Sequence, residues 1–526
     1  MESKNDVISA GSCLVSKCAP TGRNKVEIRY RSYGSPFRVV PSSRAKLPCR
    51  GNCSFRNNEK ADGMEWINNI CLLTDSYKVS HYKQYPPKTT KVYSYFESRS
   101  GSVHPQTTFF GLQYWLKQYL VGPVVTQEKI DKAEKLFNAH FGGQVFNRAG
   151  WEYILHKHGG RLPIEIKAAP EGLVVGESNV LMTVENTDPN VFWLTNYLET
   201  LLVQVWYPST VATQSRAMKN VILKYLEKTG DPGLIDFKLH DFGFRGVTCP
   251  EQAAVGGAAH LVNFKGTDNV AGLVLLNEFY HDPCAGFSIP AAEHSTITSW
   301  GKDHEVDACR NMLTQYPTGL VATVSDSFDI YNCCANIWGG VLKDEVAARD
   351  GTLVVRPDSG DPPEVVVKVL DILGEKFGFT TNSKGYKVLH PKVRVIQGDG
   401  IDFKMLDVIL SAMEHARWSA DNISFGSGGG LLQKLNRDTQ RFAFKCSSVT
   451  VDNHERDVFK QPITDSGKKS KAGRLKLVYE ENAEKKILIT VPASDPRPDQ
   501  LKCVFRDGAL LVDQNLAQVR EASAIL

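Results

Sequence analysis

The stretch LVVRPDSGDPPEVVVKVLDIL, residues 353–373, shows how the central part of this chain is built. It opens with the apolar run Leu353–Val355, which is typical of a buried strand. Asp361 and the two prolines after it are residue types that cap and start helices. The apolar residues that follow recur at helical spacing: Val365, Val366, Val369, Leu370 and Leu373. The stretch therefore predicts a strand, a polar turn and a helix in succession.

The same order recurs between Leu239 and Asp438. An apolar run precedes a polar or glycine-rich turn, and a helical pattern follows it. Repetition of this unit predicts an α/β fold, either a βα barrel or a doubly wound open sheet, and both place ligands at the carboxyl ends of their strands. The turns are His240–Gly243, Ala291–His294, Ser325–Asp329, Arg356–Gly360, Gln397–Gly400 and Gly426–Gly430.

Three parts are expected along the 526 residues, because one compact core rarely grows so large. Residues 1–61 form a basic, acid-poor extension. Residues 236–436 contain the repeated strand–turn–helix units and are expected to form a βα-barrel-like domain that carries the ligand-binding turns. Residues 62–235 and 437–526 are expected to form a β-rich α+β domain, and alternating patterns such as Arg474–Val478 predict strands in its second part.

Bulk composition excludes several classes of protein. The 62 basic and 58 acidic residues give a net charge of +4, which supports neither nucleic-acid binding nor a membrane-surface role. No apolar run approaches the ~20 residues of a membrane span. Twelve cysteines in so long a chain predict free thiols in a reducing compartment. We therefore expect a cytoplasmic protein, with organelle import through the basic extension as the alternative.

Two features predict phosphate binding. The turn within Phe425–Leu432 is rich in glycine and opens a helix, an arrangement that presents backbone N–H groups to anions. A basic run follows at Arg437, Lys445, Lys460 and 468–471. The plainer interpretations are a tight turn and a solvated loop.

Acidic residues and one histidine occupy the predicted turns. Asp326, Asp329, Asp358 and Asp399 could hold magnesium, although aspartate is also a common turn residue. His294 lies among small alanines beside Glu293, where an imidazole is accessible for catalysis. A lone histidine is more often structural.

Longer segments of the sequence resemble a known family. From about residue 72 to 471 the chain is similar to the nicotinamide phosphoribosyltransferases of NAD salvage. The segments that carry the resemblance are Thr74–Val79, His81–Pro87, Lys238–Gly243, Asn263–Asp268, Ala291–Thr298, Arg356–Gly360 and Gln397–Gly400. Residues 1 to about 60 do not share it.

The resemblance implies a homodimer with active sites shared between subunits, each site in an irregular barrel of the type II phosphoribosyltransferases. Phe242 and the partner's Tyr77 should sandwich the nicotinamide ring, an arrangement that suits an electron-poor pyridine. Asp268 should accept a hydrogen bond from the carboxamide and repel the carboxylate of nicotinic acid. Arg356 and Ser288 should line the same pocket.

The resemblance also implies the remaining site residues. His294 should be phosphorylated by the co-substrate ATP, with Glu293 and Asp326 orienting it, and Mg²⁺ should be held mainly through the diphosphate. Phosphoribosyl pyrophosphate should bind to basic, acidic and glycine residues: Arg245, Asp358, Arg394, Gly398, Asp399 and Gly429, with Arg99, Arg437, Lys445 and Lys460 as the diphosphate clamp. Ala322 departs from the pattern, which has serine there.

The expected reaction joins nicotinamide to phosphoribosyl pyrophosphate, giving nicotinamide mononucleotide and pyrophosphate. The nearest alternative is a nicotinate phosphoribosyltransferase, against which Asp268 argues. A signalling protein without catalysis is the alternative of a different class, and the complete set of site residues argues against it.

Overall fold

The computed structural model describes residues 65–464, 469–481 and 486–525. The expectations for residues 1–61 concern residues outside this part of the chain. The division of the rest into residues 236–436 and residues 62–235 with 437–526 stays a prediction.

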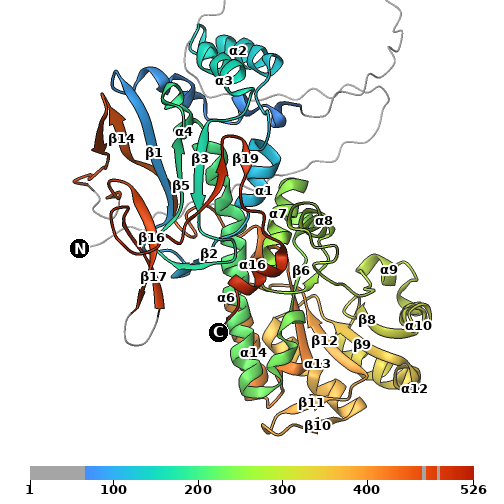
Figure 1. Cartoon of the computed structure of the whole chain (residues 1–526). Helices are drawn as coiled ribbons and strands as arrows, with labels where there is room; N and C mark the ends of the chain where they lie inside the picture. The colour runs from blue at the N-terminus through green and yellow to red at the C-terminus, as the bar shows by residue number, and fades with distance from the viewer. Residues whose placement is uncertain (1–64, 465–468, 482–485, 526) are drawn as a thin grey trace, which may run out of the picture. The chain divides into compact units, whose positions relative to one another are not determined.

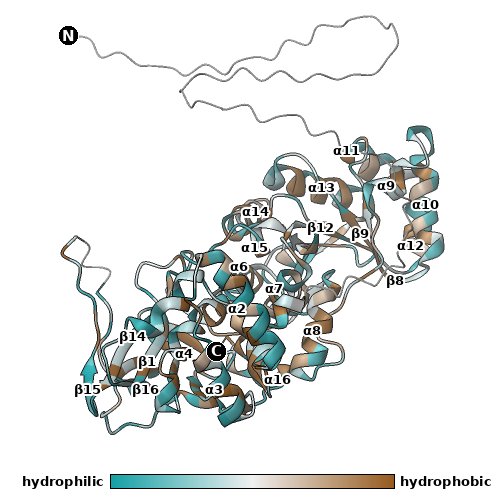
Figure 2. Cartoon of the chain, turned by 90° about the horizontal axis from the view of Figure 1, so that it is seen from above, coloured by the Kyte–Doolittle hydropathy of each residue, from teal (hydrophilic) through white to brown (hydrophobic). Residues whose placement is uncertain are grey.

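The strand–turn–helix unit predicted around residues 353–373 is confirmed. Strand β9 is Asp350–Arg356, and helix α13 is Pro362–Phe377 with proline in its first turn. The apolar residues of α13 are buried, and Figure 2 shows this helix largely in the hydrophobic colour, whereas α2 (Gln127–Phe141) is largely hydrophilic. Burial of one apolar face thus fixes how α13 lies against the sheet.

Six parallel strands form the central sheet of the second half of the chain (Figure 1). Their spatial order is β7-β6-β13-β12-β9-β8. Every neighbouring pair is parallel, so all six carboxyl ends meet at one edge. Besides β9 the strands are β6 (Leu239–Asp241), β7 (Gly266–Thr267), β8 (Thr318–Val324), β12 (Val393–Gln397) and β13 (Ile423–Ser427).

An irregular segment joins the two edge strands of this sheet. Isolated parallel bridges pair Gly266 with Phe287 and Ala291 with Ala322. The Thr267 amide donates to the Phe287 carbonyl at 3.0 Å, and the Ala322 amide donates to the Pro290 carbonyl at 2.9 Å. Residues 287–291 therefore close the wall between β7 and β8, and the fold is the expected irregular βα barrel.

A seven-stranded antiparallel sheet is built from both ends of the chain, as expected. Its spatial order is β15-β14-β1-β5-β3-β18-β19, and Figure 1 shows blue and red strands side by side in it. The strands are β1 (Thr89–Ser98), β3 (Ile164–Ala168), β5 (Val180–Asn186), β14 (Phe442–Val451), β15 (His454–Asp457), β18 (Lys502–Arg506) and β19 (Ala509–Leu510).

The remaining strands of the described residues form three two-stranded sheets. They are β2 (Gln106–Thr108) with β4 (Val174–Gly176), β10 (Phe379–Thr381) with β11 (Lys387–Leu389), and β16 (Leu475–Glu481) with β17 (Lys486–Pro492). The last pair confirms the strand expected from the alternation at Arg474–Val478.

Helices cover both sheets. None of the helices in the described part of the chain combines the length and apolar composition that a bilayer span needs. The remaining α-helices are α1 (Leu112–Trp115), α3 (Arg148–His158), α4 (Leu194–Tyr197), α5 (Glu199–Leu202), α6 (Trp206–Thr229), α7 (Pro250–His260), α8 (Val270–Tyr280), α9 (His294–Thr298), α10 (Glu305–Gln315), α11 (Ile330–Asn332), α12 (Lys343–Ala348), α14 (Phe403–His415), α15 (Gly429–Leu432) and α16 (Leu516–Ala522).

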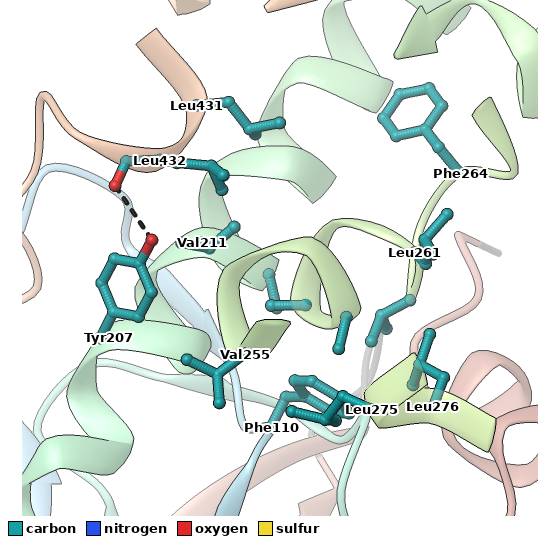
Figure 3. Close-up of a cluster of buried hydrophobic side chains, with 14 of the residues drawn as sticks. Phe110, Tyr207, Val211, Val255, Leu261, Phe264, Leu275, Leu276, Leu431 and Leu432 are labelled. Atoms are coloured by element: carbon teal, nitrogen blue, oxygen red, sulfur yellow. Dashed lines mark hydrogen bonds between the residues drawn. The ribbon is translucent and has the colours of Figure 1, made fainter. Parts of the chain in front are cut away.

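The long helix α6 packs against α7 beside the barrel, and α7 packs against α8. Figure 3 shows their side chains, such as Val211, Val255 and Leu275, in one apolar cluster. The Tyr207 hydroxyl donates to the Leu432 carbonyl at 3.0 Å, which ties α6 to the glycine-rich turn after β13. The core therefore extends directly beneath a turn expected to bind ligand.

His260 is a fully buried polar residue of this core. Its Nε2 lies 3.2 Å from the carbonyls of both Leu239 and Gly266, so Nε2 carries the hydrogen. Its Nδ1 then accepts from the Ser215 hydroxyl at 3.0 Å. Burial lowers the pKa of His260 to about 3, although the two backbone hydrogen bonds oppose this shift.

We expect His260 to make the free energy of unfolding pH-dependent in weak acid. The unfolded chain takes up this proton as the pH falls through 6.5, whereas the folded chain stays neutral until about pH 3. Stability should therefore decrease between these values by up to about 1.4 kcal/mol per pH unit from this group alone. Urea denaturation at pH 7.0, 6.0 and 5.0 measures the slope.

The variant His260→Gln removes this titration. Its unfolding free energy should therefore fall less steeply with pH, by up to about 1.4 kcal/mol per pH unit, which corresponds to one proton. His140→Gln, at an exposed histidine of α2, is the control and should keep the wild-type slope. Equal slopes in wild type and His260→Gln would contradict the assignment.

Candidate active site

Residues from the carboxyl ends of all six parallel strands line a cavity of about 880 Å³ at this edge of the sheet. They end or follow β6, β7, β8, β9, β12 and β13, so turns far apart in sequence face one space. The lining includes most of the predicted site: Phe242, Arg245, Asp268, Glu293, His294, Arg356, Asp358, Gly398, Asp399 and Gly429. Strand ends thus bring these predicted residues together.

A second cavity of about 810 Å³ lies inside the barrel. Its walls are mostly apolar, and Ala322, Val354 and Ile396 form a small buried cluster there. Phe242, Asp268 and Arg356 line both cavities, which makes these three residues the shared boundary. A flat ring with a polar substituent suits this boundary, since apolar wall and charged groups meet there.

Phe242 follows β6 directly and its ring lies against backbone. A Cβ atom at Gly426 would stand 1.9 Å from the Phe242 ring, and one at Gly398 would stand 3.3 Å from it. The Arg356 guanidinium lies 5.6 Å from the ring centroid. Glycine at position 426 is therefore required for the ring to lie where it does.

Asp268 follows the short strand β7 and is exposed to the cavities. The Ser288 hydroxyl donates a short hydrogen bond to Asp268 Oδ1. Ser288 belongs to the irregular segment that closes the barrel wall and lines the inner cavity. The two predicted amide-binding residues thus form one hydrogen-bonded pair.

His294 begins α9 and its side chain is 48% exposed. Its Nε2 lies 3.4 Å from Asp358 Oδ2 and 3.8 Å from Asp326 Oδ1, and its Nδ1 lies 3.4 Å from the Ser327 hydroxyl. The imidazole is therefore accessible on one side and faces acidic groups on the other. Glu293 instead accepts a hydrogen bond from the Ser295 hydroxyl, so it does not orient the ring directly.

Three buried polar atoms near these strand ends have no hydrogen-bond partner among the described residues. They are Asp326 Oδ1, Arg356 Nε and Gln397 Oε1. Native structures pair nearly all buried polar atoms, so these three atoms are available to water, an ion or a ligand. Asp326 is otherwise fixed, since its Oδ2 accepts from the Asp358 amide at 3.1 Å and from the Ser359 hydroxyl at 2.5 Å.

Several predicted residues lie outside the first cavity. Arg394 lines the inner cavity, where its guanidinium donates to the carbonyls of Leu389, His390 and Val393. Tyr77, in the 3₁₀ helix Ser76–Lys83, is 58% exposed and lines neither cavity.

The four residues of the expected diphosphate clamp also lie apart from the cavity. Burial lowers the pKa of Lys445, and the charges of Arg99, Lys460 and Arg437 lower it further, while Glu199 opposes them. Arg99 has two buried guanidinium nitrogens without a hydrogen-bond partner, although its Nε lies 3.8 Å from Glu97 Oε1. Four cations near one another, with unused donors, are suited to an anion.

The sequence prediction gave no role to several residues that line the first cavity, among them Asp241, Phe244, Val270, Val324, Ile401 and Lys434. Lys434 had a signal, because it lies one turn beyond the glycine-rich stretch Gly426–Gly430. Asp241 had no such signal, because within the segment Lys238–Gly243 it looks like an ordinary acidic residue at the end of a strand. Burial raises its pKa to about 6, and the charge of Asp268 adds to this shift.

Comparison with known proteins gives the family. The nicotinate phosphoribosyltransferase family model matches residues 237–509, and the N-terminal domain model of nicotinamide phosphoribosyltransferase matches residues 69–166. Among solved structures, nicotinate-nucleotide pyrophosphorylase from Pyrococcus furiosus is similar with a TM-score of 0.56 and 16% identity, covering 90% of this chain and 97% of that one. That likeness shows the fold alone.

Two relatives are much closer in sequence. The nicotinamide phosphoribosyltransferase of Xanthomonas campestris pv. campestris is 52% identical over 468 residues, which cover 87% of this chain and 98% of that protein. The protein of the same name from Acinetobacter baylyi is 31% identical over 486 residues, covering 86% and 96%. The chain therefore belongs to the nicotinamide phosphoribosyltransferase family of enzymes.

Proposed function

We propose that this enzyme makes nicotinamide mononucleotide and pyrophosphate from nicotinamide and phosphoribosyl pyrophosphate, as a step of NAD salvage. The observation that carries the proposal is the Asp268–Ser288 pair beside Phe242, at the boundary of the two cavities. Family membership and the 52% identical relative named for this reaction support it.

The nicotinamide ring would lie against Phe242, with its carboxamide directed to Asp268. The carboxylate accepts a hydrogen bond from the amide NH₂, whereas it would repel the carboxylate of nicotinic acid. The Arg356 guanidinium beside the same ring would complete the pocket. These contacts hold the ring and leave its nitrogen free to attack.

The phosphoribosyl group would lie at the turns after β12 and β13, where Gly398, Asp399 and Gly429 line the first cavity. Glycines let phosphate oxygens approach backbone N–H groups closely. The ring nitrogen attacks C1 of the ribose as the bond from C1 to the pyrophosphate oxygen breaks. Positioning and charge stabilisation contribute most in such a reaction.

Magnesium would accompany the diphosphate. Among the described residues no cluster of three or more acidic, histidine or cysteine side chains could hold the ion by itself, so it would be held mainly through the diphosphate. Asp326 Oδ1, which has no hydrogen-bond partner, and the cavity-lining Asp358 and Asp399 could assist. The bound ion would neutralise the charge of the diphosphate as it leaves.

His294 would couple the reaction to ATP. The γ-phosphoryl group would pass to an imidazole nitrogen as ADP leaves, and the charged product would strengthen binding of the sugar diphosphate. The 48% exposure of His294 and the acids on its far side support this role.

A homodimer would complete each site. Arg99, Lys445 and Lys460 do not line the cavity that contains His294, nor does Tyr77. We infer that these residues of one subunit reach the cavity of the other, where the clamp binds diphosphate and Tyr77 covers the nicotinamide ring.

The first test concerns the choice of ring. Asp268→Ser should relax discrimination against nicotinic acid by roughly 10- to 100-fold, because it removes a like-charge repulsion of about 1.4–2.8 kcal/mol. Competition between the two rings for limiting phosphoribosyl pyrophosphate measures the ratio. A wild-type enzyme that prefers nicotinic acid would contradict the proposed substrate.

The second test concerns the phosphohistidine. His294→Ala should abolish stimulation by ATP and keep a weak ATP-independent reaction, since the attacking ring does not need the imidazole. Product formation with and without ATP measures this, and His304→Ala, at an exposed histidine outside the cavity, is the control. Undiminished stimulation in His294→Ala would rule out this role.

The third test concerns the shared site. His294→Ala and Lys445→Ala should each lose ATP-stimulated turnover, yet refolding them together should restore about a quarter of the wild-type value, because random pairing leaves one complete site in each mixed dimer. Two variants in the same group, Lys445→Ala and Lys460→Ala, should not complement. Failure of the first mixture would place both residues in one subunit's site.

A further inference from the structure

The buried residue Asp241 lies between the two loops that bind the ring in the proposed function. It ends β6 and is 0% exposed. Phe242 follows it directly, and Thr267, its partner in the parallel register, directly precedes Asp268. One side chain therefore stands where the ring-stacking loop and the amide-binding loop leave the sheet.

Asp241 bonds to both loops. Its Oδ1 accepts from the Gly243 amide at 2.7 Å, which fixes the turn that carries Phe242. Its Oδ2 accepts from Asn269 Nδ2 at 2.9 Å, and its backbone carbonyl accepts from the Asp268 amide at 3.0 Å. Each of its three oxygens thus has a separate task.

Asn269 carries this connection to the helices behind. Its Nδ2 also donates to the Ala253 carbonyl of α7 at 2.9 Å, and its side-chain oxygen caps α8 by accepting from the Gly272 amide at 3.4 Å. A Cβ at Gly257 would stand 2.5 Å from Asn269 Nδ2, so the side chain has little room to shift. The pair is anchored in the core.

Strand pairing alone holds the second loop weakly. Strand β7 has only two residues, and the register between β6 and β7 contains two residue pairs. The position of Asp268 relative to Phe242 therefore depends on side-chain hydrogen bonds more than on the ladder.

We propose that Asp241 is a positioning residue for the ring subsite, which sets the spacing between Phe242 and Asp268 through its hydrogen bonds to Gly243 and Asn269. This inference rests on the proposed function for its ligand, nicotinamide. The stacking surface and the amide acceptor hold one rigid molecule, so a change in the distance between them weakens the binding of nicotinamide. The phosphate-binding turns are unchanged.

The substitution Asp241→Asn exchanges one acceptor oxygen for an NH₂ group, which sets a donor against Asn269 Nδ2 or Gly243 N. The KM for nicotinamide should rise roughly tenfold or more, while the KM for phosphoribosyl pyrophosphate stays within about twofold. Asn269→Ser removes the same hydrogen bond from the other side and keeps an oxygen cap for α8. It should show the same split, and the double variant should be little worse than either single one.

Glu171→Gln is the matched control. Glu171 is also buried and also accepts from backbone amides, those of Gly111 at 3.0 Å and Gln113 at 2.6 Å, outside both cavities. A purely structural loss lowers stability and active fraction in all variants alike. Equal changes in the two KM values for Asp241→Asn, or no change in either, would overturn the proposal.

Hydrogen exchange measured by mass spectrometry tests the same connection without turnover. In Asp241→Asn and in Asn269→Ser, peptides that contain Phe242–Gly246 and Thr267–Gly272 should exchange faster together, whereas Glu171→Gln should leave both protected. Faster exchange in one loop only would overturn the proposal. If the wild type makes no product from nicotinamide, the proposed function fails, and the exchange result still decides whether Asp241 couples the loops.

Discussion

Parallel pairing of the barrel strands is the constraint on which the site depends. Because β6, β13, β12, β9 and β8 run in one direction, the residues after each strand meet at one edge. His294, Asp358 and Asp399 come from distant segments and yet line a single cavity. An antiparallel neighbour anywhere in this sheet would send its turn to the opposite end, and the cavity would lose that wall.

The boundary between the two cavities concentrates the chemistry of the site. Phe242, Asp268 and Arg356 offer an aromatic face, an acceptor and a cation within one small region. Buried atoms without a hydrogen-bond partner, such as Arg356 Nε and Asp326 Oδ1, lie beside it. Their unfavourable burial in the free protein becomes favourable when a ligand pairs with them, which is how a preformed polar site contributes to affinity.

The sequence predicted regular parts of the molecule better than irregular ones. The β9–α13 unit followed from apolar spacing and the prolines at its start, and the strand at 474–478 followed from alternation. Residues 287–291 could not be recognised as barrel wall, because isolated bridges leave no periodic pattern. The clustering of His294 with Asp326 and Asp358 could be expected once all three were placed at strand ends. The position of Arg394 inside the barrel could not be expected from the sequence. Its guanidinium contacts backbone carbonyls, which leave no sequence signal.

Strand β7 and residues 287–291 have few backbone hydrogen bonds to the rest of the sheet. In the proposed function, ring selectivity and phosphoribosyl binding therefore rest on different parts of the barrel. In that proposal, selectivity for the ring substituent depends on Asp268 and Ser288, which lie on the least regular part of the wall. The turns proposed to bind the phosphoribosyl group follow β12 and β13, each of which pairs with a strand on both sides. Substitutions that change ring preference can therefore accumulate at little cost to the scaffold, and descendants of one barrel could diverge toward rings of different charge while keeping a common sugar-phosphate donor.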